Sequence, residues 1–274
     1  MKSTINTWET RRYPELSKSY KGRFPFKVAT TSYIYPDHIV PNVKMLAPYL
    51  DEIELLFFES SENSLPSSPD IDTLAIISQE EALSCNVHLP LDCHLGDPNQ
   101  NVRDYAVTTI QKIIDLTGML NPSTYTLHLS LKKGERVNET AIIEWQKRVG
   151  ESMERILAKG ISPKKISVEN LTYPFEWAEE VIKMHGLSVC LDVGHILING
   201  YNIASYAQKY LEDTTIIHLY GARKAHEHKG LDVLGEDRER SIKEVLKGFT
   251  GVVSLEVFSF DDLQRSLTCL DRWV

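Results

Sequence analysis

The sequence predicts an α/β fold, a (β/α)8 TIM barrel preceded by an N-terminal extension. Eight short apolar runs are spread along the 274 residues, and helix-like stretches separate them. Alternation of strands and helices is typical of βαβ units, and about 250 residues is the usual length of such a barrel. Histidines and carboxylates stand at the C-terminal ends of most runs. A β/α barrel brings those ends together at one mouth, so the pattern also predicts a single site there.

Each predicted element follows from the local pattern. Residues 1–23 are polar and lack the alternation, so we interpret them as the extension and residues 24–274 as one barrel domain. Several apolar runs are rich in Val, Ile and Leu, as expected for parallel strands buried on both faces. The acidic residues 51–54 are interpreted as a solvated start of the second strand. The predicted strands are residues 26–32, 53–58, 86–89, 125–129, 165–169, 187–192, 215–220 and 251–257.

Helices are predicted between these strands. Residues 138–158 form the clearest one, because Ile142, Val149, Met153 and Ile156 recur at helical spacing and Gly160 follows as a stop. Comparable stretches are residues 103–116, 174–185, 203–211 and 239–246.

Composition narrows the classes of partner and compartment. The net charge is -8, and no Lys or Arg occurs between Lys44 and Arg103, a stretch that includes two loops at the predicted barrel mouth. A nucleic-acid partner would need clustered cations there, so we expect none. The four cysteines lack CxxC spacing and favour free thiols. With no apolar leader and no run long enough to cross a bilayer, we expect a cytoplasmic protein without a membrane partner. The oligomeric state is left open.

Residues able to bind metal follow seven of the eight strands, and a histidine pair lies in the loop after the seventh. Imidazole and carboxylate ligands together suit Zn²⁺ or Mn²⁺. Carboxylates can bridge two such ions, which activate water for attack on a phosphodiester. The residues are Glu59, His88, His128, Glu169, Asp192, His195, His218, His226, His228 and Glu256.

The segment CLDVGHILINGYNI, residues 190–203, carries a resemblance to a known family. It is similar to the D-x-x-H…GY-D/N-I pattern of the apurinic endonuclease IV family, within the xylose-isomerase-like barrels. The resemblance implies two or three bound metal ions per chain. Glu169 would bridge the first two ions around the hydrolytic hydroxide. The implied ligands are His88, His128 and Glu169 for the first ion, Glu169, Asp192, His218 and Glu256 for the second, and His195, His226 and His228 for the third.

One feature of the third set departs from the family pattern. The chain has His226-Glu227-His228 where the family has D-x-H, so a histidine replaces an aspartate. This makes the implied third set less anionic. Asp232 is an alternative ligand in the same loop.

Residues 24–60 and the later VHLPLD, residues 87–92, resemble the cobamide-remodelling phosphodiesterases. That resemblance implies a metal-dependent phosphoric diester hydrolase acting on the nucleotide loop of a cobamide, the vitamin B12 class of molecule. The products would be cobinamide and an α-riboside phosphate, for remodelling or salvage. Tyr33 is then a candidate for stacking on the substrate, and Arg223 and Lys224 for neutralising its phosphate. Glu59 is a candidate general base, with helix capping as its alternative role.

Three other functions fit parts of the pattern. A sugar isomerase or epimerase would need one ion, held by residues such as Glu169, Asp192, His218 and Glu256. An endonuclease IV-like DNA-repair enzyme would need a basic rim. A corrinoid-binding or metal-binding protein without activity would need no reaction at all. The number of ions bound and the turnover of substrate separate these alternatives.

Overall fold

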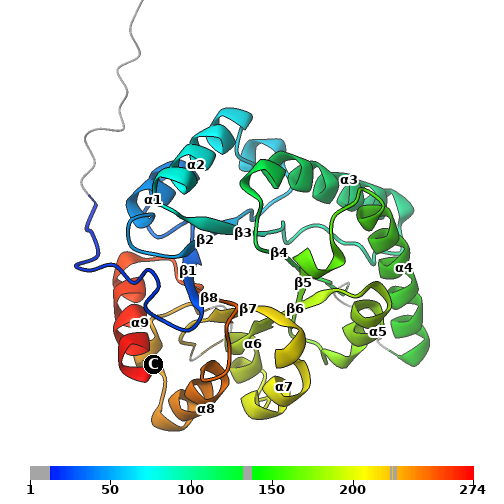
Figure 1. The fold of residues 1–274 in the computed structure, drawn as a ribbon. Coiled ribbons are helices and arrows are strands. Elements are labelled where there is room, and N and C mark those ends of the chain that lie inside the picture. Colours follow the sequence, from blue (N-terminus) through cyan, green and yellow to red (C-terminus); the bar gives the residue numbers. More distant parts are fainter. Residues whose placement is uncertain (1–12, 132–137, 223, 225–226) are drawn as a thin grey trace, which may run out of the picture.

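Eight parallel strands close into a barrel in the computed structural model, which describes residues 13–131, 138–222, 224 and 227–274. Each strand pairs with the next along the chain, and β8 returns to pair with β1. Figure 1 shows the strands at the centre with the helices arranged around them. The strands are β1 (Lys27–Thr31), β2 (Glu52–Leu56), β3 (Ser84–His88), β4 (Tyr125–Leu127), β5 (Ile166–Glu169), β6 (Ser188–Asp192), β7 (Thr214–Leu219) and β8 (Val252–Leu255). The predicted fold class is confirmed, and every predicted strand is present within a few residues of its expected bounds.

Nine α-helices occur among the residues that the structure describes. Helix α4 lies close to its predicted bounds, and α3, α5, α7 and α8 correspond to the other predicted stretches. Sequence reasoning missed α1, α2, α6 and α9. The helices are α1 (Ile39–Leu46), α2 (Ser68–Glu80), α3 (Gln100–Thr117), α4 (Glu139–Leu157), α5 (Glu176–His185), α6 (Val193–Ile198), α7 (Ile203–Tyr210), α8 (Glu236–Leu246) and α9 (Phe260–Trp273).

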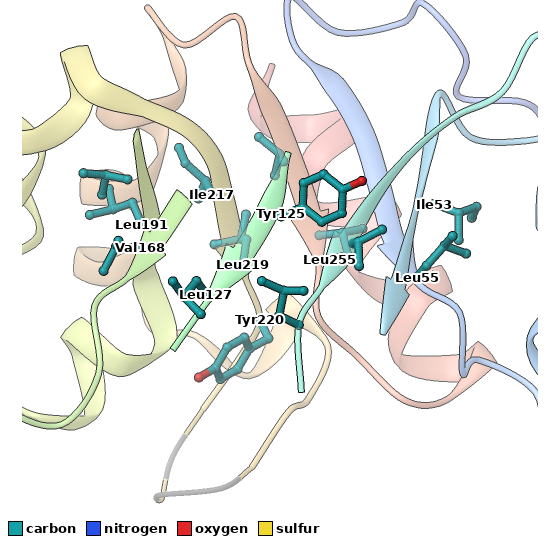
Figure 2. Close-up of a cluster of buried hydrophobic side chains, with 14 of the residues drawn as sticks. Ile53, Leu55, Tyr125, Leu127, Val168, Leu191, Ile217, Leu219, Tyr220 and Leu255 are labelled. Atoms are coloured by element: carbon teal, nitrogen blue, oxygen red, sulfur yellow. The ribbon is translucent and has the colours of Figure 1, made fainter. Parts of the chain in front are cut away.

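The two faces of the barrel strands carry different residues. Apolar side chains such as Ile53, Leu55 and Val168 belong to the main hydrophobic cluster, which also contains residues of the surrounding helices. Figure 2 shows part of this layer, with side chains from β2, β4, β5, β6, β7 and β8. The alternate positions hold buried polar groups that contact one another inside the barrel, as Glu54 of β2 contacts Ser254 of β8. The strands are buried on both faces, as expected, but the face that points into the barrel is largely polar.

The start of β2 corrects one expectation. Glu52 and Glu54 are fully buried inside the barrel and are not part of a solvated segment. Glu52 accepts hydrogen bonds from Asn86 Nδ2 at 2.9 Å and Ser84 Oγ at 2.6 Å. Alternation explains the error, because residues two apart in a strand share a face and this face points into the bore.

The described part of the N-terminal segment, from Tyr13, packs against the barrel. Leu16 and Tyr20 are buried in the main cluster, and the Tyr35 hydroxyl donates to the carbonyl of Pro14 at 2.8 Å. Lys18 forms an ion pair with Asp271 in α9. The division at residue 23 stays a prediction. No helix among the described residues combines the length and apolar character needed to cross a bilayer.

Candidate metal centre

The C-terminal ends of six strands deliver candidate ligands to the same mouth of the barrel. The register of the sheet explains the convergence, since Asp192 of β6 lies beside His218 of β7 in the pairing. Parallel strands in a closed barrel end at one face, so ligands far apart in sequence meet there. The residues are His88 at the end of β3, His128 just after β4, Glu169 at the end of β5, Asp192 at the end of β6, His218 in β7 and Glu256 just after β8.

Glu169 lies at the centre of this cluster. Its Oε2 is 2.8 Å from His128 Nε2 and 3.3 Å from His88 Nε2. The same oxygen is 3.7 Å from His218 Nδ1, and Oε1 is 3.5 Å from His195 Nδ1. Four imidazoles therefore surround one buried carboxylate. The bridging role expected for Glu169 stays a prediction.

A second group of ligands adjoins the first. His218 Nδ1 is 3.6 Å from Glu256 Oε2, and Asp192 Oδ2 is 3.7 Å from His195 Nδ1. Three sets of ligand atoms each lie within 4.8 Å of one another: His88, Glu169 and His218; Glu169, Asp192 and His195; and Asp192, His218 and Glu256. The sets share members, so the centre is continuous.

Backbone carbonyls orient three of the histidine rings. His88 Nδ1 lies 3.0 Å from the carbonyl of Leu89, and His195 Nδ1 lies 2.9 Å from that of Asn170. His228 Nδ1 lies 2.9 Å from the carbonyl of Glu256. A carbonyl only accepts, so each Nδ1 carries the proton and each Nε2 keeps a lone pair for a cation.

The local fold of residues 192–195 follows from helix capping. Asp192 is the N-cap of α6, and its Oδ1 accepts the backbone N–H of His195 at 2.6 Å. This bond satisfies a free N–H of the first turn. It also leaves Asp192 Oδ2 available to the cluster.

The electrostatics of the cluster favour a bound cation. Burial raises the pKa of Asp192 to about 6, and nearby Glu169 adds to the rise against the effect of His195. Burial also raises the pKa of Glu256 well above its usual value, with Asp192 and Glu169 contributing. Glu169 behaves oppositely, because His128 and His218 outweigh its burial and hold its pKa well below the usual range. Carboxylates that repel one another in a buried site are stabilised by a bound cation.

Unpartnered ligand atoms support the same conclusion. Asp192 Oδ2, His218 Nδ1 and Glu256 Oε2 are buried and have no hydrogen-bond partner among the described residues. Buried polar atoms are nearly always paired, so these three require an explanation. A divalent cation satisfies all of them, and a mixed imidazole and carboxylate set suits Zn²⁺ or Mn²⁺. The residues present thus fit a metal centre.

Two members of the implied third set, His195 and His228, are among the described residues. His228 Nδ1 is 3.7 Å from Glu256 Oε2, and His195 Nδ1 is 3.5 Å from Glu169 Oε1. His226 lies outside the described residues, as does Arg223. Asp232, the alternative ligand, forms an ion pair with Arg265 at 3.1 Å and is half-exposed. The third set therefore stays a prediction.

The remaining candidates lie around the mouth and not among the ligands. The Glu59 side chain is exposed and belongs to none of the three ligand sets, so its catalytic role stays a prediction. Lys224 is also exposed. Tyr33 is part of an aromatic wall, which we define as Tyr33, Phe58 and Phe258. Ring centroids of Tyr33 and Phe58 are 5.1 Å apart, and those of Phe58 and Phe258 are 6.1 Å apart.

The aromatic wall adjoins the metal centre through His228. The Phe258 ring is 5.2 Å from the His228 ring, which stacks on Tyr220 at 4.0 Å. Phe58 is 41% exposed and Phe258 is 38% exposed. Exposed aromatic rings beside a polar centre form a surface on which a substrate ring can pack.

Sequence reasoning missed three residues that support the ligands. Glu54 Oε1 is 2.9 Å from His218 Nε2. Asn170 donates from Nδ2 to the carbonyl of Asp192 at 3.0 Å and accepts the Asp192 N–H at 2.7 Å. The Tyr220 ring stacks on His228. Asn170 directly follows Glu169 and Glu54 alternates with apolar residues, and these are the signals that could have identified them.

Comparisons with known proteins agree with this description. A family model described as a xylose isomerase-like TIM barrel matches residues 50–273. No curated protein matches the chain. A D-tagatose 3-epimerase-like protein is 18% identical, with a TM-score of 0.76, and the match covers 90% of this chain and 97% of that one. Endonuclease IV from Thermus thermophilus is 17% identical, with a TM-score of 0.66 and coverage of 90% and 99%. The IOLI protein, solved with a bound zinc atom, is 16% identical, with a TM-score of 0.68 and coverage of 90% and 96%. At these identities the solved structures show the fold alone.

Proposed function

We propose that this chain, which belongs to the xylose isomerase-like TIM barrel family, is a metal-dependent phosphoric diester hydrolase. The solved structures that share its fold are of enzymes that include epimerases and an endonuclease. The proposed substrate of this chain is the nucleotide-loop phosphodiester of a cobamide, and its products are cobinamide and an α-riboside phosphate.

One observation carries the hydrolase proposal. His88 and His128, from the ends of β3 and β4, both approach Glu169 Oε2, at 3.3 Å and 2.8 Å. A one-ion isomerase needs a single set such as Glu169, Asp192, His218 and Glu256. Two additional imidazoles on the shared carboxylate supply ligands for a second ion, and two ions suit attack on a phosphodiester.

The candidate ligands form two groups that share Glu169. His88, His128 and Glu169 would hold one cation, and Glu169, Asp192, His218 and Glu256 would hold another. Cations bound there lower the pKa of water and neutralise charge that develops on phosphate oxygens. Glu169 keeps its charge because His128 and His218 hold its pKa well below its usual range.

Features around the mouth favour a small, ring-bearing substrate over DNA. Residues 45–102 include the loops after β2 and β3 and contain no Lys or Arg. A duplex backbone needs many phosphate contacts from cations. The aromatic wall instead offers apolar ring surface beside the centre, where a planar macrocycle or base can pack.

A one-ion sugar epimerase is the second candidate, and a specific observation favours it. Glu169 and Glu256 both lie within 4 Å of His218 Nδ1, on β5 and after β8. Two carboxylates held around a common ion can also exchange protons with a sugar carbon. The D-tagatose 3-epimerase-like neighbour shares the fold.

The test is direct comparison of substrates. Protein loaded with Zn²⁺ or Mn²⁺ is incubated with adenosylcobalamin, with D-fructose and with abasic duplex DNA, and products are identified by mass and chromatography. Release of cobinamide, with Glu169→Gln inactive but folded, supports the proposal. Epimerised sugar, incised DNA, no product with any substrate, or full activity in the Glu169→Gln variant would overturn it.

A further inference from the structure

Glu54 is a buried carboxylate that sits beneath the metal centre. It lies in β2, is fully buried and contacts residues of two other strands. Its Oε1 is 2.9 Å from His218 Nε2 in β7. Its Oε2 accepts a 2.6 Å hydrogen bond from Ser254 Oγ in β8. The carboxylate is therefore held in place by Ser254 and faces the side of the His218 ring that points away from the ligands.

His218 differs in this respect from the histidines described above. His88, His195 and His228 each direct Nδ1 to a backbone carbonyl, which leaves Nε2 for a cation. His218 presents Nδ1 to Glu169 and Glu256, at 3.7 Å and 3.6 Å, and turns Nε2 toward Glu54. The His218 ring is thus turned the other way. The nitrogen that points away from the candidate ligands is Nε2, and it faces a carboxylate instead of a backbone carbonyl.

We propose that Glu54 is a positioning residue, which keeps the proton of His218 on Nε2 and so makes Nδ1 the atom that binds a divalent cation. The inference rests on the metal centre of the proposed function and is independent of which substrate is cleaved. A carboxylate acceptor fixes the tautomer of a ligand histidine, restricts its ring and increases its basicity. Glu54 touches neither substrate nor cation in this scheme.

Comparison with Glu52 shows why Glu54 is more than a buried polar group. Glu52, two residues earlier on the same face, accepts hydrogen bonds from Asn86, Ser84 and Ser123, with Lys27 3.4 Å away. Other parts of the barrel thus compensate its charge. Neither Glu54 Oε1 nor His218 Nε2 has another partner among the described residues, and these two atoms face each other at 2.9 Å. The imidazole is the group that faces this oxygen, so the buried charge of Glu54 would be balanced through His218 and a cation bound to that ring.

The experiment compares Glu54→Gln with Glu52→Gln. Both variants exchange a buried carboxylate of β2 for an amide of the same size, but only Glu54 faces His218. Ser254→Ala is a third variant, which removes the hydrogen bond that holds Glu54 and keeps its charge. Thermal unfolding of the metal-free proteins identifies the temperature range in which each variant is folded, and the measurements are made within it.

The first readout is the affinity for Zn²⁺, measured by competition with a chromophoric chelator. We expect Glu54→Gln to weaken one bound ion by about 10- to 100-fold, the usual effect of losing such a partner. Ser254→Ala should weaken it by a smaller factor, and Glu52→Gln should leave it within about 3-fold. Wild-type affinity in Glu54→Gln, or an equal loss in Glu52→Gln, overturns the inference.

The second readout is the tautomer of His218, measured by ¹⁵N NMR of the Zn²⁺-loaded protein labelled at histidine and assigned with a His218→Gln variant. We expect a proton on Nε2 that exchanges slowly with water in the wild type, and a shifted, faster-exchanging proton in Glu54→Gln. A proton on Nδ1 in the wild type overturns the inference. If the Zn²⁺ and NMR results hold but no cobamide is cleaved, the proposed substrate fails while the role of Glu54 stands.

Discussion

Replacing Gly194 with alanine should disturb the candidate metal centre through packing alone. Gly194 lies between Asp192 and His195 in the first turn of α6. A Cβ built there would be 2.1 Å from Tyr220 Cζ and 2.5 Å from its hydroxyl oxygen. Carbon atoms in contact are normally about 3.5–4.0 Å apart, so the Tyr220 ring or the α6 backbone would have to move by roughly 1.5 Å.

The surroundings of Tyr220 determine the magnitude. Its side chain is 1% exposed, and its ring stacks on His228 with 4.0 Å between centroids. The ring therefore cannot move toward solvent without displacing a packed neighbour. Overpacking of a buried site usually costs about 1–3 kcal/mol. We expect Gly194→Ala to be at the upper end, with a loss of about 3 kcal/mol, because the clash involves a rigid aromatic ring.

The assay is guanidinium denaturation of the metal-free protein, which separates packing from metal binding. Gly118→Ala is the matched control, because Gly118 has a helical φ of -57° as C-cap of α3 and no atom lies within 4 Å of a Cβ built there. The control should unfold within about 0.5–1 kcal/mol of the wild type, on the stabilising side. A Gly194→Ala protein that unfolds at the same denaturant concentration as Gly118→Ala would refute the reasoning.

Three further predictions follow from the site and its surroundings. Chelation should lower the thermal midpoint of the metal-loaded protein, because an ion present at 100 times its dissociation constant adds about 2.7 kcal/mol to the free energy of unfolding. Scanning calorimetry with Zn²⁺, Mn²⁺ and a chelator checks this, and equal midpoints would contradict it. Phe258→Ala should raise KM about 5- to 30-fold with little change in kcat, as expected when a contact made equally with bound substrate and transition state is lost. Met119 is exposed and lies outside the aromatic wall, so Met119→Ala should change neither constant. Glu179 has its pKa lowered to about 2, since hydrogen bonds from Lys209, Tyr210 and Lys183 outweigh its partial burial. A lowered folded-state pKa stabilises the protein above the unfolded-state pKa of about 4.5, and this contribution is lost as pH falls from there to about 2. Glu179→Gln should thus lower the free energy of unfolding by about 1 kcal/mol at pH 6, after allowance for solvent screening, and by only a small part of that at pH 2. A constant difference in denaturation midpoint across this range would contradict the assignment.

The strands and their terminal ligands could be predicted because local pattern and barrel geometry agree. An apolar run of suitable length gives the strand, and the closed barrel then brings every strand end to one mouth. His88, Glu169 and Asp192 are the last residues of β3, β5 and β6, so their meeting follows from the fold class alone. The loop after β7 has no comparable constraint, and the positions of His226 and Arg223 could not be deduced in this way.

Helices were harder to predict from the sequence. Helix α6 has six residues and begins at the capping bond of Asp192, so it has no apolar periodicity to reveal it. Helix α2 begins with a capping box between Ser67 and Asp70, which is a local signal that can be read from the sequence. Its apolar face is weak, since only Ile71, Leu74 and Ile77 are buried among its residues. Tertiary packing, not intrinsic pattern, specifies elements of this kind.

The second strand shows most clearly what alternation adds to the prediction. In β3, β5 and β8 the strand-end ligand is preceded two residues earlier by a small or polar residue on the same inward face: Asn86 before His88, Ser167 before Glu169 and Ser254 before Glu256. The same period in β2 runs through Glu52, Glu54 and Leu56, and Leu56 pairs with His88 in the sheet. In β2 the residue at the level of the ligands is therefore apolar. The carboxylate of this strand, Glu54, lies two residues earlier and faces His218 Nε2. Glu59, three residues beyond Leu56, is past the end of the strand, which explains why the structure places it at the surface.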